Sequence, residues 1–262
     1  RDVLGSRGLG DVYKRQVAKN EGLTAPYKPK GSEFIPAEFK DPQNYWTGIG
    51  IMPLAFITNN NFLKKNNLSA PTSWQDFLKP EYKEGLILAD ARTSGTATER
   101  LFSLERVFGR QGSIDFQKKL HKNVQMYTKS GAWPALRVGD GLAAAAMVYL
   151  PDALDIVQLG YPVTISYPKE GVTFGIEVVS LVKGAKHPTE AKEFLDWATS
   201  PKLAEFLIKN KIRYVPTRTD VKVDDPVLDL KNIQMLSVPL SEKGRLREQL
   251  TKDWIDQVLQ AK

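Results

Sequence analysis

Short, almost uninterrupted runs of apolar residues most constrain what this chain can fold into. They span residues 49–60, 86–90, 141–150 and 175–182. Apolar runs of this length, bounded by turn-forming residues, predict strands that are buried on both faces of a sheet. Amphipathic helical patterns lie between these runs. Because strands that alternate with helices form sheets covered by those helices, the pattern predicts an α/β fold with a mainly parallel sheet.

The two runs 49–60 and 175–182 bracket a self-contained α/β stretch. This arrangement predicts two lobes, with hinge strands near 49–60 and 175–182 where the chain crosses between them. Lobe 1 is expected to hold residues 17–55 and 178–262, and lobe 2 to hold residues 56–177. The chain has 262 residues, of which 42% are hydrophobic, and this is enough for one large core or two smaller ones.

The composition argues against several kinds of chemistry. The absence of cysteine excludes disulfides, thiolate nucleophiles and cysteine-held metals. The two histidines, His121 and His187, are interpreted as exposed helix-end residues, so no catalytic zinc is predicted. The net charge of +7 is spread along the chain without a nucleic-acid-binding motif, so nucleic-acid binding is not predicted. We expect no metal site and no cofactor.

Two small polar loops each lie between a predicted strand and a predicted helix. They read TSGT (Thr93–Thr96) and TKSG (Thr128–Gly131). The spacing of Thr96 and Glu99 is that of a capping box and predicts a helix beginning near Thr96. A helix start offers unpaired N–H groups and partial positive charge, glycine allows close approach, and hydroxyls add donors. The loops therefore predict an anion-binding cradle, and simple helix capping is the alternative.

Six further residues are candidates for contacts with a ligand. Arg92 and Lys129 would add positive charge, Tyr45 and Trp46 would supply aromatic walls, and Asp152 and Glu177 would add polar groups. Packing is the alternative for the aromatic residues, and capping or solvation is the alternative for the acidic ones.

Several segments, in this order and spacing, carry a resemblance to one family. They read YWTGIGIMPLAFITNN, PTSWQDFLKPEYKEGLILADARTSGTA, YTKSGAWPAL, LGYPVTISYPKEG and SLVKGAKHPTEAKEFLDWATSP. The chain resembles extracellular solute-binding proteins of ABC importers, in the ferric-iron type group that also holds binders of phosphonates and sugar phosphates. The resemblance is expected to run from about Val17 to the C-terminus. It implies a two-lobed type II periplasmic-binding fold that captures ligand between its lobes.

The resemblance also implies roles for individual residues. It makes Ser94, Gly95, Thr96, Ser130 and Gly131 contacts for an anion. Ferric members carry a tyrosine pair where this chain has Tyr149 and Leu150, so only the first position matches. Members that bind hexose phosphates carry His-Asp where this chain has Pro151 and Asp152, and a glutamate where it has Gly175. Glu177 lies two residues further along the same face of its strand and is the expected substitute.

These observations together predict a non-enzymatic importer component that captures a small solute bearing phosphate or phosphonate. The expected partners are this solute and an ABC permease in the inner membrane, and a monomer is expected. The expected location is the periplasm, or the cell exterior as a lipoprotein. Two alternatives stay open. One is a ferric-iron-binding importer component, and the other is an α/β hydrolase that uses Asp90, Asp152 or Glu177 as acid and base.

The first sixteen residues are interpreted separately from the rest of the chain. Ser6 to Gln16 show no helical or strand period. They can be back-translated, through allowed codons, into a sequence that resembles a transposase-based sequencing-library adapter. We therefore expect residues 1–16 to be translated adapter joined to a truncated gene. On this hypothesis the first lobe is incomplete, and a signal peptide is absent because the N-terminus is truncated.

Overall fold

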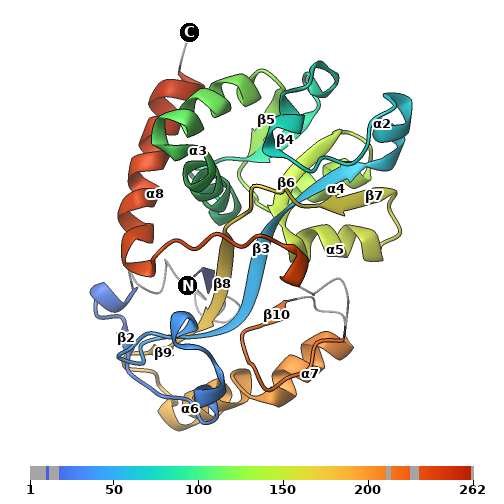
Figure 1. Cartoon of the computed structure of the whole chain (residues 1–262). Helices are drawn as coiled ribbons and strands as arrows, with labels where there is room; N and C mark the ends of the chain where they lie inside the picture. The colour runs from blue at the N-terminus through green and yellow to red at the C-terminus, as the bar shows by residue number, and fades with distance from the viewer. Residues whose placement is uncertain (1–9, 12–17, 211–213, 225–229, 261–262) are drawn as a thin grey trace. The chain divides into compact units, whose positions relative to one another are not determined.

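The computed structural model describes residues 10–11, 18–210, 214–224 and 230–260 (Figure 1). The chain divides into two compact units. Unit 1 comprises Arg1–Met52 and Gly175–Leu230, and unit 2 comprises Pro53–Phe174 and Lys231–Lys262. The chain therefore passes between the units three times: within one long strand, β3 (Thr47–Asn59), between Phe174 and Gly175, and between Leu230 and Lys231. Helices and strands alternate along unit 2, which confirms the predicted α/β class.

Unit 2 is built on a five-stranded sheet. Its strands, in spatial order, are β7 (Val163–Ser166), β3, β6 (Ala145–Tyr149), β4 (Leu86–Ala89) and β5 (Val124–Thr128). Strand β4 is parallel to β5 and β6, whereas β3 is antiparallel to β6 and β7. The prediction of a mainly parallel sheet is therefore right for β4, β5 and β6 but wrong for β3, which brings the chain in from unit 1 against their direction.

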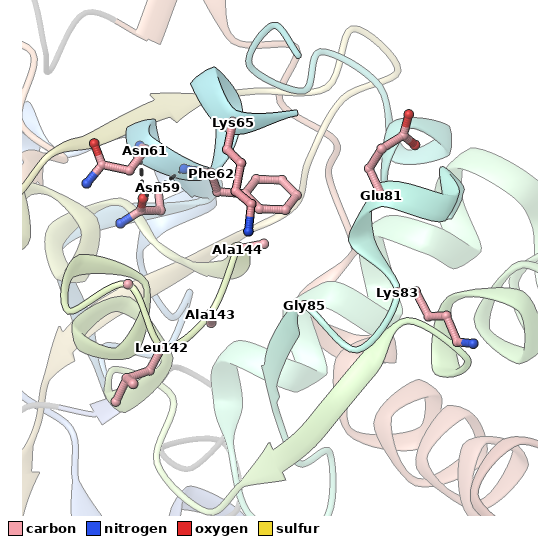
Figure 2. A pocket seen from close by; sticks show the side chains of 11 residues that line it. Asn59, Asn61, Phe62, Lys65, Glu81, Lys83, Gly85, Leu142, Ala143 and Ala144 are labelled. Atoms are coloured by element: carbon pink, nitrogen blue, oxygen red, sulfur yellow. Dashed lines mark hydrogen bonds between the residues drawn. The ribbon is translucent and has the colours of Figure 1, made fainter. Parts of the chain in front are cut away.

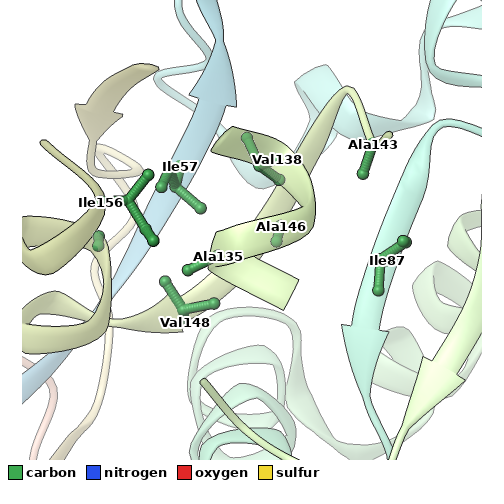
Figure 3. Packing of buried hydrophobic residues seen from close by; sticks show 9 residues of the cluster. Ile57, Ile87, Ala135, Val138, Ala143, Ala146, Val148 and Ile156 are labelled. Carbon is green, nitrogen blue, oxygen red and sulfur yellow. The ribbon is translucent and has the colours of Figure 1, made fainter. Parts of the chain in front are cut away.

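The helices of unit 2 pack around this sheet. They are α2 (Asn60–Lys65), η3 (Trp74–Leu78), η4 (Pro80–Tyr82), α3 (Gly95–His121), α4 (Trp133–Gly139), α5 (Leu150–Gln158), α8 (Leu240–Trp254) and η7 (Ile255–Leu259), with η6 (Leu230–Asn232) at the unit boundary. Helices α4 and α5 bury Val138 and Ile156 against Ile57 of β3 and Val148 of β6, as Figure 3 shows. Helix α3 bends at Gly109, where φ is +70°.

The C-terminal segment belongs to unit 2, so its expected place in lobe 1 is wrong. Helix α8 lies beside α3 (Figure 1), and the two share a buried cluster with Leu101, Leu250 and Trp254. The ring of Trp254 is 1% exposed and meets Tyr127 of β5 edge-on, with 5.0 Å between ring centroids. An amphipathic stripe shows that a helix packs on something, but it does not show which lobe supplies the partner.

In its described ranges, unit 1 contains mostly short antiparallel strands, together with short 3-10 helices and the α-helices α6 and α7. Its elements are β1 (Gly10–Asp11), β2 (Thr24–Ala25), η1 (Ser32–Phe34), η2 (Ala37–Phe39), the first part of β3, β8 (Phe174–Val179), β9 (Leu181–Val182), α6 (Pro188–Ala198), α7 (Pro201–Lys209) and β10 (Val215–Pro216). Strand β1 pairs with β8, β10 with β3, and β2 with β9. Leu195 of α6 and Leu203 of α7 pack under Val179 and Leu181. Of the expected adapter residues, only Gly10 and Asp11 are described, and the others lie outside the described ranges.

The packing of α8 can be tested by substituting Trp254 with alanine. Removing a fully buried tryptophan should lower the free energy of unfolding by about 3–5 kcal/mol. Trp197→Ala on α6 is the control, because that side chain is 45% exposed and should cost much less. Urea unfolding followed by circular dichroism gives both values. Equal losses would show that α8 is not packed as described.

Candidate functional site

The two polar loops of unit 2 meet at one edge of its sheet. Parallel strands β4 and β5 are in register at Ala89 and Thr128, so both loops leave the sheet at the same level. The Asp90 N–H donates to the Thr128 carbonyl oxygen at 2.9 Å. The Thr93 hydroxyl donates to the Lys129 carbonyl oxygen at 3.1 Å. The loops are thus joined by hydrogen bonds from both backbone and side chain.

Gly131 makes the closest approach between the loops. A Cβ atom added to it would lie 2.2 Å from Thr96 Oγ1 and 2.8 Å from Ser94 Oγ. Both distances are far below van der Waals contact, so this position accepts only glycine without a shift of its neighbours. The hydroxyls of Ser94 and Thr96 and the backbone of Gly131 therefore form one compact group, which we call the cradle together with Gly95 and Ser130.

The cradle lies at the start of the long helix α3. Ser94 is the N-cap residue, but its side chain makes no capping hydrogen bond. The predicted capping box of Thr96 and Glu99 is therefore wrong. Glu99 is fully buried and instead accepts a hydrogen bond from Lys243 of α8 at 2.8 Å. The first-turn N–H groups of α3 lack helical acceptors, as at any helix start, and the buried Ser94 hydroxyl lies beside them.

Ser130 contributes a hydroxyl from the second loop. Its Oγ accepts a hydrogen bond from the Trp133 N–H at 3.2 Å, just where α4 begins. Its carbonyl oxygen accepts the Thr128 hydroxyl at 2.7 Å. These bonds fix the loop. They use Ser130 Oγ only as an acceptor, so its hydroxyl proton can still be donated to an anion.

The charged residues near the cradle are partly neutralised. The Arg92 guanidinium holds the Asp90 carboxylate through Nε at 3.0 Å and Nη2 at 2.6 Å. This pairing lowers the pKa of Asp90 and reduces the free positive charge that Arg92 was expected to supply. Lys129 is exposed, and its backbone carbonyl rather than its ammonium group joins the loops.

A further cation, Arg100, was missed by sequence reasoning. It is 2% exposed and donates to the Ala89 carbonyl oxygen at 3.1 Å, and its charge also lowers the pKa of Asp90. Among the described residues, its Nε has no hydrogen-bond partner. The sequence signal is weak, because Arg100 lies at the margin of the apolar stripe, three residues after Ala97 and four before Leu104.

Tyr149 and Asp152 lie at the carboxyl end of β6, which is parallel to β4 and so ends at the same sheet edge as the cradle. Tyr149 is the N-cap residue of α5, and Asp152 lies in its first turn. Burial, with a smaller contribution from the charge of Asp155, raises the pKa of Asp152 to about 6.

The other candidates, Tyr45, Trp46 and Glu177, belong to unit 1. Trp46 is 3% exposed, which favours packing, the alternative considered for it, over an open aromatic wall. The turn beside it is organised by Asp41, which accepts the Tyr45 N–H at 3.1 Å and binds Lys19 at 2.7 Å. Glu177 is half-buried in β8.

A separate pocket of about 400 Å³ lies at the opposite edge of the unit 2 sheet. Gly85 and Ala144, which precede β4 and β6, line it together with Asn59, and Figure 2 shows Phe62 and Lys65 extending over it from α2. None of the predicted ligand-binding residues lines this pocket.

The described ranges hold no group of three or more His, Asp and Glu side chains suited to a metal. Every helix there is too short or too polar to span a bilayer.

Comparison with known proteins identifies the family. Residues 2–238 match the family of bacterial extracellular solute-binding proteins. The chain belongs to this family. A Haemophilus influenzae relative, itself uncharacterised, is 30% identical over 97% of this chain and 76% of its own length. The match begins at residue 2, so the expectation that the likeness starts near Val17 is wrong.

Solved structures place the chain among two-lobed periplasmic binding proteins. The periplasmic binding protein AfuA from Actinobacillus pleuropneumoniae, solved with exogenous fructose-6-phosphate bound, is 27% identical, with a TM-score of 0.86 over 97% of this chain and 82% of that one. The periplasmic binding protein P5PA is 24% identical, with a TM-score of 0.85 over 95% of this chain and 82% of that one. A ferric-binding protein from Campylobacter jejuni shares the fold. It is 22% identical, with a TM-score of 0.75 over 94% of this chain and 81% of that one. The predicted type II fold and the role as a solute-binding component of an ABC importer are confirmed.

The close contact at Gly131 predicts a marked effect of Gly131→Ala. The new methyl group would overlap Thr96 Oγ1, so the variant should lose about 1–3 kcal/mol of unfolding free energy. Gly112→Ala, also in unit 2, is the control because its added Cβ meets nothing closer than 3.1 Å. Thermal unfolding measures both, and a Gly131→Ala variant as stable as the control would contradict the described contact.

The raised pKa of Asp152 predicts a pH-dependent effect of Asp152→Asn. Because the folded-state pKa of about 6 exceeds the ordinary value, the unfolded chain loses this proton first as pH rises. The stability contributed by Asp152 therefore falls between about pH 4 and pH 6, and asparagine has no proton to lose. The variant should gain about 1–3 kcal/mol relative to wild type between pH 4 and pH 7 in urea unfolding. Parallel pH profiles for the two proteins would contradict the assignment.

Proposed function

We propose that this protein captures a small solute bearing phosphate or phosphonate, and that the anionic group binds at the cradle in unit 2. The observation that carries this proposal is the contact of Gly131 with the hydroxyls of Ser94 and Thr96. It gathers hydroxyl donors from one loop against the backbone of another, beside the unpaired N–H groups at the start of α3. Tetrahedral oxyanions accept several hydrogen bonds at once, and helix starts favour negative charge.

The electrostatic surroundings favour an anion over a neutral group. The partial positive charge at a helix start is worth about 0.3–1 kcal/mol to a nearby anion, and more when it is partly buried. Arg100 adds a buried positive charge next to β4, and exposed Lys129 adds another from the second loop. The carboxyl of Asp152, with its pKa of about 6, carries only part of its negative charge in mildly acidic solution and then repels an anion less.

The similarity to AfuA, solved with fructose-6-phosphate bound, supports a phosphorylated sugar or a related organic phosphate as the solute. Asp152 is present where hexose-phosphate binders carry an aspartate, whereas Pro151 and Gly175 replace the other two expected residues. We assign the organic part of the solute to Tyr149 and Asp152, at the carboxyl end of β6 in unit 2.

The remaining steps of the proposal concern delivery. The loaded protein is expected to act as a monomer in the periplasm and to pass its solute to an ABC permease in the inner membrane. Membership in a family of extracellular solute-binding proteins supports this location and this role.

Calorimetry with inorganic phosphate, methylphosphonate, fructose 6-phosphate and fructose tests the proposal. At least one phosphorus-bearing compound should bind, and fructose should not. Ser94→Ala combined with Ser130→Ala should weaken binding about 100-fold or more, because each hydrogen bond to a charged group is worth about 1.5–3 kcal/mol. Unchanged affinity in the double variant would remove the site assignment.

Two controls separate the competing functions in the same samples. Recovery of intact fructose 6-phosphate distinguishes capture from hydrolysis. A visible charge-transfer band on addition of ferric salt with phosphate, absent in Tyr149→Phe, would favour the ferric alternative over the proposal.

A further inference from the structure

The helix that begins at the cradle is attached, one to two turns later, to the segment that leads out of unit 2. Thr173 is 1% exposed and stands two residues before Gly175, where unit 1 resumes. Its N–H donates to Ser103 Oγ at 2.9 Å, and its hydroxyl donates to the Glu99 carbonyl oxygen at 2.8 Å. The Ser103 hydroxyl also donates to the Glu99 carbonyl oxygen, at 2.9 Å. The polar groups of this segment are therefore bonded to α3 rather than to water.

The same threonine also bonds to the crossing in β3. The Leu54 N–H donates to the Thr173 carbonyl oxygen at 3.1 Å, and Leu54 is the second residue of unit 2 on β3. One residue thus bonds both to the cradle helix and to the strand through which the chain enters unit 2.

Helix α8 supplies a third connection through Lys243. This side chain is 4% exposed and donates to Glu99 Oε1 at 2.8 Å and to the Phe174 carbonyl oxygen at 3.0 Å. Phe174 is the last residue of unit 2 before the chain leaves it. A single buried ammonium group therefore joins the cradle helix to the exit segment.

We propose that Glu99, Ser103, Thr173 and Lys243 are positioning residues that couple anion capture at the cradle to two of the chain crossings, the one in β3 and the one after Phe174. The proposal rests on the proposed function, since it requires an anion at the start of α3. Ser103 is eight residues, or about 12 Å of rigid helix, from Gly95. The cluster is buried and hydrogen-bonded, so a displacement of the α3 start cannot be absorbed by loose side chains and reaches the backbone of Thr173 and Leu54.

Amide hydrogen exchange, read by NMR on the full chain, tests this coupling with inorganic phosphate as the probe. Saturating phosphate should slow exchange at Ala97, near the cradle. It should also slow exchange at Leu54 and Thr173 by about fivefold or more, the lower end of typical coupling between sites. The measured quantity is the ratio of exchange rates with and without phosphate, so each variant is its own reference.

Ser103→Ala and Ser113→Ala form a matched pair of variants. Both remove a buried hydroxyl from α3, but the bond that the described residues give Ser113 Oγ comes from Gln117 of the same helix, at 3.1 Å. Ser103→Ala should keep the phosphate effect at Ala97 and lose it at Leu54 and Thr173, whereas Ser113→Ala should keep all three. If Ser103→Ala does not fold, Thr173→Val removes the partner hydroxyl with little change of shape and takes its place.

The outcomes separate the two proposals. Absence of any phosphate effect at Ala97 in the wild-type protein, with no binding of the calorimetry panel, overturns the proposed function. A phosphate effect at Ala97 without one at Leu54 and Thr173 overturns the coupling but not the cradle assignment. The same holds if both variants retain the effect at Leu54 and Thr173. Loss at the distant amides in Ser103→Ala alone supports it.

Discussion

The buried ion pair between Glu99 and Lys243 is the interaction on which the arrangement of unit 2 most depends. Both side chains are almost inaccessible to solvent, with 2.8 Å between carboxylate and ammonium group. The free energy needed to remove two charges from water offsets much of their electrostatic attraction, so the pair contributes little net stability. Leaving either charge without its partner costs about 3–5 kcal/mol, however. Helix α8 must therefore meet α3 at this one position, which explains why the C-terminal segment belongs to unit 2.

The ion pair and the cradle fix the same helix from two directions. Lys243 holds α3 from α8, and the backbone of Gly131 lies close to the hydroxyls of Ser94 and Thr96 at the start of the helix. The donors proposed to bind an anion therefore lie together before a ligand arrives. A preorganised site loses less conformational entropy on binding than a flexible loop with the same residues.

The sequence predicted those features that depend on local patterns. The apolar run 49–60 became β3 (Thr47–Asn59), and the run 86–90 became β4 (Leu86–Ala89), because continuous apolar residues suit a strand covered on both faces. The run 141–150 was only partly a strand. Gly141, with φ at +76°, begins the turn that leads into β6, and Leu150 begins α5.

Features that depend on distant partners could not be predicted in this way. Glu99 has the spacing of a capping residue, but Lys243 lies 144 positions away and offers the fully buried carboxylate a charge-assisted bond. The pairing of Arg92 with Asp90 depends on a local turn geometry that residue spacing does not specify. Trp46 lies beside Tyr45 in the sequence, but its burial favours packing. In each case the tertiary environment, rather than the residue type, determined the outcome.

The cradle shows how an anion site is built with little free charge. Arg92 is committed to Asp90, and Arg100 is buried beside Ala89. The groups left to meet a ligand directly are hydroxyls and backbone N–H groups, with Lys129 as the exposed cation. Neutral donors in a partly buried site select by geometry and are screened by salt much less than exposed charges. Since binding energy then depends on several aligned hydrogen bonds, a small displacement of the α3 start weakens all of them together. Under the proposed function, the protein must release its solute to a permease. This arrangement favours release, because it requires a shift of one helix start and no separation of a strong ion pair.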